Sequence, residues 1–381
     1  MIEKIKTIGI DARFYGPANK GLGRYTKEIV DGVVNSDKNN KFVIFLCKEN
    51  YHKFKTNNIR VKKVLADVRW YSFAEQILMP YYVWREKVNL MHWTHFNVPF
   101  FCTFQKFIVT IHDLILIKFP TKRATTLSPL IYKIKNKCYK IIIKRAVKKS
   151  KKIITISKHV KEDIKQQFKI KGDKIIIIYE GVSNILKQDI QYDKKSILRY
   201  NINNPFILYV GNAYPHKNLE GLINVFEKIK QTNNNLLLVL VGKEDYFYKQ
   251  IKEKAKKSKY SKDIIFPGFV PDKDLINFFK LALVYVFPSF YEGFGLPPLE
   301  AMQNGCPVVS SNKTCLPEIL GNAVEYFNPE NKNEMIEKIN KLINNINLRK
   351  QLINNGYERV KKYDWNKCIK ETLKIYYNIF L

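Results

Sequence analysis

The feature that most constrains the fold is a regular alternation of short β-branched segments with longer segments of helical periodicity. The 381-residue sequence repeats this alternation from end to end, which is typical of βαβ units and of parallel sheets covered by helices. A chain of this length exceeds one ordinary domain of roughly 150 residues. The pattern therefore predicts an α/β protein with two hydrophobic cores.

The first half of the chain, residues 1–190, is predicted to form one doubly wound, Rossmann-like domain. Strands are expected at residues 6–10, 42–46, 61–65, 107–111, 153–156 and 175–178, and helices at 24–34, 73–86, 129–147 and 158–168. A polar stretch at residues 183–204 interrupts the alternation and is the expected linker.

The alternation resumes in residues 205–363, which are predicted to form a second Rossmann-like domain. Strands are expected at residues 206–210, 236–241, 264–266, 284–287, 308–309 and 324–326, and helices at 219–230, 274–281 and 298–303. Sheets of this kind bind ligands at the carboxyl ends of their strands. Two such domains facing a central cleft are therefore expected to hold the ligand between them.

The segment PSFYEGFGLPPLEAMQNGCP, residues 288–307, is the most informative in the sequence. Gly293 and Gly295 allow the backbone to approach a ligand closely. The prolines that follow preset the first turn of a helix, whose N–H groups and dipole suit a diphosphate. Glu300, expected in that first turn, can accept hydrogen bonds from two ribose hydroxyls. The alternative is a glycine turn and a helix whose acids only favour the dipole.

Glu292 stands eight residues before Glu300, and EGFGLPPLEAMQNGCPVV resembles the donor-site signature of the retaining glycosyltransferases of family 4, which have the GT-B fold. The resemblance implies that Glu300 holds the ribose and that Glu292 contacts the donor sugar. It assigns the diphosphate to the backbone amides of Gly293, Phe294, Gly295 and Leu296. It also implies that a C-terminal helix, about residues 364–381, crosses back onto the first domain.

Lys217, in ILYVGNAYPHKNLEGLI, follows the first expected strand of the second domain. At that sheet edge its ammonium can neutralise charge on a leaving diphosphate, whereas a lone lysine is more often a solvated surface charge. Asn218 is the expected N-cap of the next helix. Family members commonly have two cationic residues around this loop, and Asn212 and His216 occupy places where arginine is frequent.

Two motifs of the first domain acquire a function through the resemblance. GLGRYT resembles the family's glycine-rich loop over donor and acceptor, which assigns Gly21 and Gly23 to donor binding, and a flexible loop is the alternative. His112, at a His-Asp step after a strand, is either a half-buried strand cap or the family's histidine beside the donor sugar. The predicted catalytic residues are therefore His112, Glu292 and Lys217. The family mechanism implied is retention without a covalent intermediate.

The basic charge is unevenly distributed. Of a net +32, residues 1–190 carry 38 Lys/Arg against 15 Asp/Glu (+23), and residues 191–381 carry 28 against 19 (+9). Compositional bias is one explanation, but the asymmetry favours an anionic partner for the first half. Residues 132–152 hold ten basic side chains, which form either a solvated helix face or a patch for an anionic membrane and the acceptor. The predicted patch contains Lys140, Lys144, Arg145, Lys148 and Lys149.

The sequence predicts no metal and no other cofactor. Asp272 and Asp274 form an Asp-x-Asp that could hold a divalent cation, but they open a helical pattern, so helix capping is preferred. His92 and His95 have no accompanying ligand cluster for zinc. The six cysteines are scattered without a CxxC pair, which favours reduced thiols.

The combined prediction is a hexosyltransferase that moves a sugar onto a glycan or lipid-linked acceptor in lipopolysaccharide or exopolysaccharide synthesis. GLGRYT, HDL and GNAYPHKNL resemble bacterial mannosyltransferases, so GDP-mannose is the favoured donor and UDP-sugars remain open. A sugar-nucleotide epimerase of the same fold is one alternative. A basic nucleic-acid-binding protein is another, but the sequence lacks its aromatic-basic platforms. With no apolar run near the roughly 18 residues of a membrane helix and no signal-peptide pattern, we expect a cytoplasmic protein, peripheral at the membrane.

Overall fold

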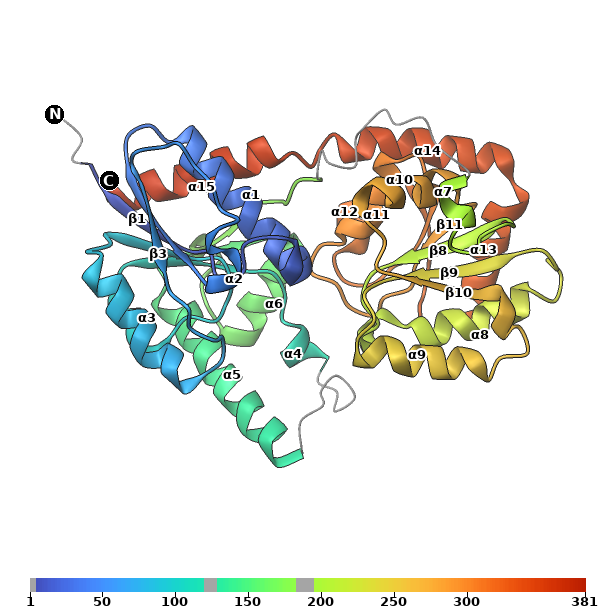
Figure 1. Ribbon diagram of the computed structural model, residues 1–381, viewed down its shortest axis with the longest axis horizontal. Coiled ribbons are helices and arrows are strands. Elements are labelled where there is room, and N and C mark those ends of the chain that lie inside the picture. Colours follow the sequence, from blue (N-terminus) through green and yellow to red (C-terminus); the bar gives the residue numbers. More distant parts are fainter. Residues whose placement is uncertain (1–4, 120–128, 183–194) are drawn as a thin grey trace. The chain divides into compact units, whose positions relative to one another are not determined.

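The computed structural model describes residues 5–119, 129–182 and 195–381. The described residues form two compact units (Figure 1). Unit 1 takes its residues from Met1–Ile117, Leu127–Gly181 and Asp364–Leu381, and unit 2 from Lys118–Thr126 and Val182–Tyr363. Each unit contains one parallel sheet, as the alternation of strand and helix patterns predicts.

The sheet of unit 1 has seven parallel strands in the order β3-β2-β1-β4-β5-β6-β7. Their bounds are β1 Thr7–Asp11, β2 Lys41–Leu46, β3 Val61–Leu65, β4 Leu90–Trp93, β5 Phe107–Ile111, β6 Lys152–Thr155 and β7 Ile175–Ile177. The direction of winding reverses between β1 and β4, so the carboxyl ends of these two strands flank the switch point at which such sheets bind ligands.

Alternate strand residues of unit 1 enter two separate cores, because successive side chains of a strand point to opposite faces. The covering helices include α1 Lys20–Ser36, α3 Phe73–Arg85, α5 Pro129–Lys149, α6 Lys158–Phe168 and α15 Trp365–Phe380. Phe42 and Ile44 of β2 pack with α1 and α15, whereas Val43 and Phe45 pack with α3, α5 and α6. Burial of both faces explains why the strand sequences are almost continuously apolar.

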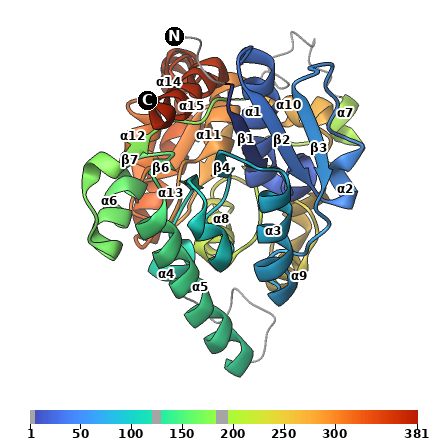
Figure 2. The same cartoon turned by 90° about the vertical axis from the view of Figure 1, so that its left-hand side faces the viewer.

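The C-terminal helix α15 is part of unit 1, although the chain reaches it through unit 2. It packs on α1 (Figure 2), where Gly32 makes room for it, because a Cβ at Gly32 would lie 2.0 Å from Ile369 Cδ1. The Tyr376 hydroxyl lies 2.6 Å from Nδ1 of the buried His92. The helix thus contributes both apolar packing and a buried hydrogen bond to the core of unit 1.

The sheet of unit 2 has six parallel strands in the order β10-β9-β8-β11-β12-β13. Their bounds are β8 Phe206–Val210, β9 Leu237–Val241, β10 Ile264–Gly268, β11 Val284–Phe287, β12 Val308–Ser311 and β13 Val324–Phe327. The main helices are α8 Leu219–Ile229, α9 Tyr246–Lys256, α10 Asp272–Leu281, α11 Leu296–Gln303, α13 Lys332–Asn344 and α14 Ile346–Val360. Here the winding reverses between β8 and β11, the two strands that precede the predicted donor-site motifs.

Several details of the fold differ from the sequence-based expectations. The strand β4 was not predicted, because Leu90–Trp93 contains no β-branched residue. Helix α1 begins at Lys20 rather than at residue 24. The expected boundary at residue 190 lies outside the described residues, and the described part of the expected linker contains the short helix α7, Lys195–Leu198.

Candidate functional site

The turn between β11 and α11 forms the centre of the candidate site in unit 2. Gly295 ends this turn with φ 101° and ψ 52°, a left-handed conformation that favours glycine. Helix α11 begins directly after it at Leu296, with proline in its first turn. The predicted donor-binding residues Gly293, Phe294, Gly295 and Leu296 therefore lie together at the N-terminus of one helix. Pro297 and Pro298 carry no N–H, so the backbone amides that can face an anion here, together with the helix dipole, are those of the turn up to Leu296.

Lys217 and Glu292, two of the predicted catalytic residues, form an ion pair. Lys217 Nζ lies 2.6 Å from Glu292 Oε1, and the two side chains are only 13% and 9% exposed. The ammonium also lies 5.6 Å from the centroid of the Phe287 ring. Lys217 is therefore not a solvated surface charge. Its largely buried environment strengthens the attraction between its ammonium and any nearby anion. The carboxylate of Glu292 is the group that balances its charge in this structure.

Hydrogen bonds join the two loops that carry this ion pair. The Phe290 N–H donates to the His216 carbonyl oxygen over 2.8 Å. Asn218 occupies the N-cap position of α8, but its side-chain amide donates to the carbonyl oxygens of Pro288 and Pro329 at 3.2 and 3.3 Å. The predicted N-cap position of Asn218 is confirmed, but its side chain makes no capping hydrogen bond and instead ties three loops at the carboxyl edge of the sheet.

His216 is a neutral, buried side chain next to Lys217. Burial lowers the pKa of His216 to about 3, and the charge of Lys217 lowers it as well. The histidine therefore cannot supply the second positive charge that arginine often gives at this position in the family. Within the loop Pro215–Lys217, the cation that faces the site is Lys217.

Glu300 lies deeper in α11 than the sequence predicted. It is the fifth residue of a helix that starts at Leu296, beyond the first turn, and it is 5% exposed. The carboxylates of Glu300 and Glu292 both affect the pKa of the buried Tyr285. Burial raises the pKa of Tyr285, and the charges of Glu300 and Glu292 raise it further. The two glutamates of the motif therefore approach one region of unit 2.

His112 lies at the carboxyl end of β5 in unit 1, with both ring nitrogens engaged. Nε2 lies 3.0 Å from the Thr94 carbonyl oxygen and Nδ1 lies 3.2 Å from Glu180 Oε1. Burial alone would lower the pKa of His112, but the hydrogen bond and charge of Glu180 outweigh it, so the pKa is raised. Two acceptors require two N–H donors, which only the imidazolium form provides. Glu180 was not singled out from the sequence, although it is an isolated acid soon after β7.

Gly21 and Gly23 belong to the first turns of α1 rather than to a loop before it. A Cβ at Gly23 would lie 2.0 Å from the Gly16 carbonyl oxygen, so glycine is required there by the close approach of the preceding loop. A Cβ at Gly21 would meet open space for 4 Å among the described residues. Of the two predicted donor-binding glycines, Gly21 leaves room for a ligand and Gly23 is fixed by packing.

A buried charge network, missed by the sequence analysis, supports the same edge of the unit 1 sheet. Arg13 is fully buried and lies 2.8 Å from Asp11 and 2.7 Å from Glu75. Glu75 also accepts hydrogen bonds from the Asn97 side chain at 2.9 Å and from the Tyr71 N–H at 2.8 Å. The network joins the segments after β1 and β4 to the start of α3. Its only sequence signal is DAR directly after a strand.

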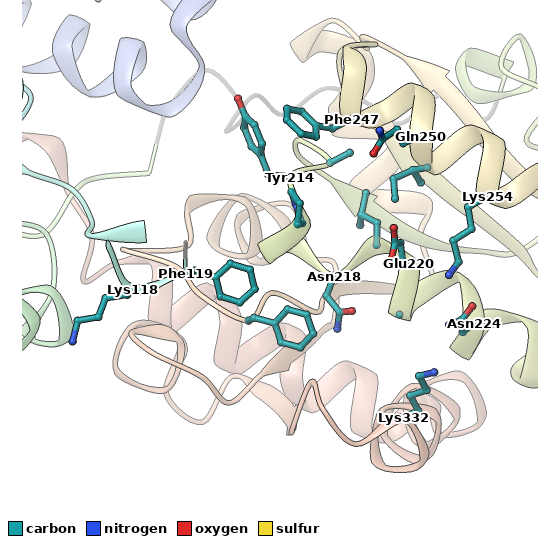
Figure 3. Close-up of a pocket in the computed structure, with 16 residues that line it drawn as sticks. Lys118, Phe119, Tyr214, Asn218, Glu220, Asn224, Phe247, Gln250, Lys254 and Lys332 are labelled. Carbon is teal, nitrogen blue, oxygen red and sulfur yellow. The ribbon is translucent and has the colours of Figure 1, made fainter. Parts of the chain in front are cut away.

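A cavity of about 520 Å³ lies in unit 2 at the N-termini of α8 and α9 (Figure 3). Aromatic rings of Phe119, Tyr214, Phe247 and Phe290 line it, together with Asn218, Glu220, Asn224, Gln250, Lys254 and Lys332. Asn218 and Phe290 belong to the loops that carry the Lys217–Glu292 pair, so the cavity adjoins those loops. Lys217, Glu292 and Glu300 are not among its lining residues.

The predicted basic patch lies on α5. Lys140, Lys144, Lys148 and Lys149 are exposed and Arg145 is half-buried. The Arg145 guanidinium lies 3.8 Å from the centroid of the Phe100 ring. The patch is therefore a cationic helix face with an aromatic neighbour.

The structure gives other partners to Asp274 and His92, which belong to the two motifs that the sequence analysis rejected as metal sites. Asp274 lies in the first turn of α10 and forms an ion pair with Arg199, so it pairs with an arginine rather than capping the helix. His92 is a core residue that hydrogen-bonds Tyr376 and Thr110. Within residues 5–119, 129–182 and 195–381, no three His, Cys, Asp or Glu side chains gather as a metal site would require.

Comparison with known families identifies both units. Residues 20–184 match the family model described as Glycosyltransferase Family 4, and residues 192–359 match the model described as Glycosyl transferases group 1. The chain belongs to glycosyltransferase family 4. Among curated relatives, the O-antigen chain mannosyltransferase B of Escherichia coli is 34% identical over 45% of each chain. The O-antigen chain mannosyltransferase RfbU of Salmonella typhimurium is 25% identical over 79% of this chain and 77% of its own.

Solved glycosyltransferase structures share the whole fold. A sucrose-phosphate synthase from Thermosynechococcus elongatus gives a TM-score of 0.75 at 17% identity and covers 98% of this chain and 99% of its own. WaaG, a glycosyltransferase involved in lipopolysaccharide biosynthesis, gives 0.75 at 14% identity over 97% of this chain and 99% of its own. The predicted GT-B fold of two Rossmann-like domains is confirmed. The comparisons favour neither the epimerase nor the nucleic-acid-binding alternative.

No helix among the described residues is both long enough and apolar enough to span a bilayer.

Proposed function

We propose that this family 4 glycosyltransferase is a retaining hexosyltransferase, with mannose as the favoured sugar and GDP-mannose as the favoured donor. The acceptor is a glycan or a lipid-linked glycan in surface polysaccharide synthesis. The observation that carries the proposal is the Lys217–Glu292 pair, 2.6 Å apart, beside the N-terminus of α11. The choice of mannose rests on the two O-antigen mannosyltransferase relatives.

The chemistry of the site suits a nucleoside diphosphate as the leaving group. A diphosphate at the N-terminus of α11 is stabilised by the backbone N–H groups of the turn from Gly293 to Leu296 and by the helix dipole. We expect one of its oxygens to replace Glu292 as the partner of Lys217, which places an ammonium where charge builds as the glycosidic bond breaks. The carboxylate of Glu292 is then available to accept hydrogen bonds from hydroxyls of the transferred hexose.

The proposal needs neither a metal ion nor a covalent enzyme intermediate. The helix N-terminus and Lys217 provide the charge stabilisation that a divalent cation gives in other transferases. Glu292 is engaged as a hydrogen-bonding and ion-pairing group, and the leaving diphosphate itself accepts the proton of the attacking hydroxyl. His112, whose ring is held by Thr94 and Glu180, is assigned to positioning of the donor sugar.

The test is binding and transfer with defined donors in the presence of EDTA. Thermal shift against GDP, UDP and their sugars identifies the nucleotide, and transfer from the best donor to a lipid-linked acceptor is followed by mass spectrometry. We expect Lys217→Met and Glu300→Ala each to lower turnover by on the order of 10²-fold. Lys228→Met, which removes an exposed lysine of the same unit, is the matched control and should transfer normally.

Two results would refute the proposal. One is wild-type turnover in the Lys217→Met or Glu300→Ala variant. The other is transfer that EDTA abolishes and a divalent cation restores, because the site would then depend on a metal.

We further propose a cytoplasmic location with peripheral attachment to the membrane, where lipid-linked acceptors are found. The support is the cationic face of α5, whose sequence in Pro129–Lys149 contains no Asp or Glu. Anionic headgroups attract such a cluster of Lys and Arg.

A further inference from the structure

Helix α3 of unit 1 is apolar on the side that it exposes. Its inner side buries Met79 and Val83, as a surface helix should. Its outer side carries Phe73, Ile77, Leu78, Tyr81 and Trp84, which are 83%, 55%, 40%, 50% and 77% exposed. A helix that is apolar all round is normally buried on all sides. The outer side of α3 is therefore an exposed apolar surface, which is unfavourable in water.

The 3₁₀ helix η2, Phe100–Phe104, extends this apolar surface. Phe101 and Phe104 are 55% and 81% exposed. The Phe100 N–H donates to the Gln76 side-chain oxygen of α3 over 2.7 Å, which fixes η2 against α3. The exposed aromatic residues of η2 therefore belong to a segment that packs directly on α3.

Helix α5 borders the same surface with positive charge. The Arg145 guanidinium lies 3.8 Å from the Phe100 ring centroid and 5.8 Å from that of Phe104. Ile134 and Ile141, on the same helix, are 56% and 51% exposed. The described exposed lysines of α5 are Lys135, Lys137, Lys140, Lys144, Lys148 and Lys149. Both α3 and α5 can be followed in Figure 2.

We call this surface the aromatic–basic face, made of Phe73, Ile77, Leu78, Tyr81, Trp84, Phe101, Phe104, Ile134, Ile141 and the cations of α5. We propose that the aromatic–basic face docks on an anionic lipid bilayer, with the rings of α3 and η2 inserted at headgroup depth and the α5 cations among the headgroups. Trp and Tyr favour this interfacial depth because their rings are amphipathic. The inference extends the peripheral attachment of the proposed function from charge attraction to insertion of named side chains.

Charge selects the lipid surface over a protein partner. Lysine is depleted in protein–protein interfaces, whereas lysine and arginine beside exposed aromatic residues are typical of helices that lie in a membrane interface. A second copy of this chain would face the same surface across a twofold axis, which brings the α5 cations of both copies together. Such like-charge contacts oppose association.

The test is co-sedimentation of the full chain with vesicles of phosphatidylcholine alone or with phosphatidylglycerol. We expect binding to phosphatidylglycerol vesicles that falls at least tenfold in a Trp84→Ser/Phe104→Ser double variant. Ile59→Ser is the matched control, because Ile59 is 97% exposed in the same unit but outside the face, and it should bind as the wild type does. Lys144→Glu/Lys148→Glu should remove the preference for phosphatidylglycerol. Circular dichroism verifies that each variant is folded.

Insertion depth is measured through Trp84. We expect its fluorescence to be quenched by lipids brominated near the headgroup and the quenching to be lost in Trp84→Phe. Wild-type vesicle binding by the Trp84→Ser/Phe104→Ser variant would overturn the inference. A stable dimer in analytical ultracentrifugation that this variant dissociates would also overturn it, because the face would then join two copies.

The outcomes separate this inference from the proposed function. Sugar transfer to a short, water-soluble acceptor needs no vesicle, so the Trp84→Ser/Phe104→Ser variant should retain it. If the wild type transfers sugar normally but does not bind vesicles, the membrane-docking inference alone is refuted. If the wild type binds vesicles but transfers no sugar from any nucleotide sugar, the proposed function alone is refuted.

Discussion

At the scale of single residues, the protonation state of His112 decides what its ring can do. Its two ring nitrogens face two acceptors, the Thr94 carbonyl and the Glu180 carboxylate. The hydrogen bond and the charge of Glu180 raise the pKa of His112, although burial alone would lower it. The imidazolium form has the two N–H donors that these two acceptors suit, so the surroundings of His112 favour a positively charged ring.

Replacing Glu180 with Gln should lower the pKa of His112, because burial then acts without the compensating carboxylate. A raised pKa stabilises the fold below the unfolded value of about 6.5, and the contribution is lost as pH rises through the folded pKa. The variant should therefore lose most stability near pH 5.5 and less at pH 9. An NMR titration of the ring protons and urea unfolding at both pH values measure this. An unchanged pKa would contradict the assignment.

Gly23 and Gly21 form a matched pair for separating packing from ligand binding. Gly23→Ala should destabilise the protein by about 1–3 kcal/mol, because the new methyl group overlaps the Gly16 carbonyl oxygen. Gly21→Ala faces open space and should be neutral or slightly stabilising in thermal unfolding. If Gly21 contacts the donor, its alanine variant should still weaken nucleotide-sugar binding in calorimetry. Equal stabilities of the two variants would contradict the packing argument.

The sequence predicted that Gly293, Phe294, Gly295 and Leu296 lie together, because these residues are contiguous in the chain. Gly293 to Glu300 lie on one turn and one helix, so their spacing already determines their placement. Glu180 and the Arg13 network could not be found in this way, since their partners are distant in the chain and only the folded sheet brings them together. The N-cap position of Asn218 could be predicted, but the partners of its side chain could not, because they lie on two other loops.

At the scale of elements, β4 and α15 show what local pattern does not reveal. The strand Leu90–Trp93 is held between β1 and β5 by pairing on both sides, which overrides its weak β-propensity. Its His92 is buried by α15, a helix from the far end of the chain. The alternation of strands and helices predicted the other strands, because their apolar β-branched runs carry the signal locally.

Tyr376→Phe should expose the dependence of β4 on α15. The substitution keeps the ring but removes the hydroxyl that bonds His92 Nδ1, which leaves a buried polar atom unpaired at a cost of about 1–3 kcal/mol. Urea unfolding followed by tryptophan fluorescence measures the loss. Tyr246→Phe, at an exposed tyrosine of unit 2, is the control and should unfold as the wild type does. A loss below a few tenths of a kcal/mol in Tyr376→Phe would contradict the expectation.

At the scale of the whole molecule, the chain builds two sheets but does not divide into two consecutive segments. The last segment of unit 1, Asp364–Leu381, follows unit 2 in the chain. Each unit has its own parallel sheet. Removal of residues 364–381 therefore takes packing residues from unit 1 and leaves all strands and helices of unit 2 in the chain.

Deletion of residues 364–381 should therefore destabilise unit 1 selectively. It removes Trp365, Ile369 and Tyr376 from the core that also contains β1, β2 and α1. Hydrogen exchange should show lost protection in β1, β4 and α1, with β8–β13 protected as in the full chain. Uniform loss of protection in both sheets would show instead that the two units unfold as one.

The ion pair between Lys217 and Glu292 also bears on the end of the reaction cycle. An ammonium buried to this extent would bind a spent nucleotide tightly if departure left it without a counterion. Because Glu292 stands within reach, Lys217 can exchange one negative partner for another as the nucleotide leaves. If the proposed donor binds as expected, Glu292 would lower the barrier to release of the nucleotide, and we expect its loss to slow turnover at product release.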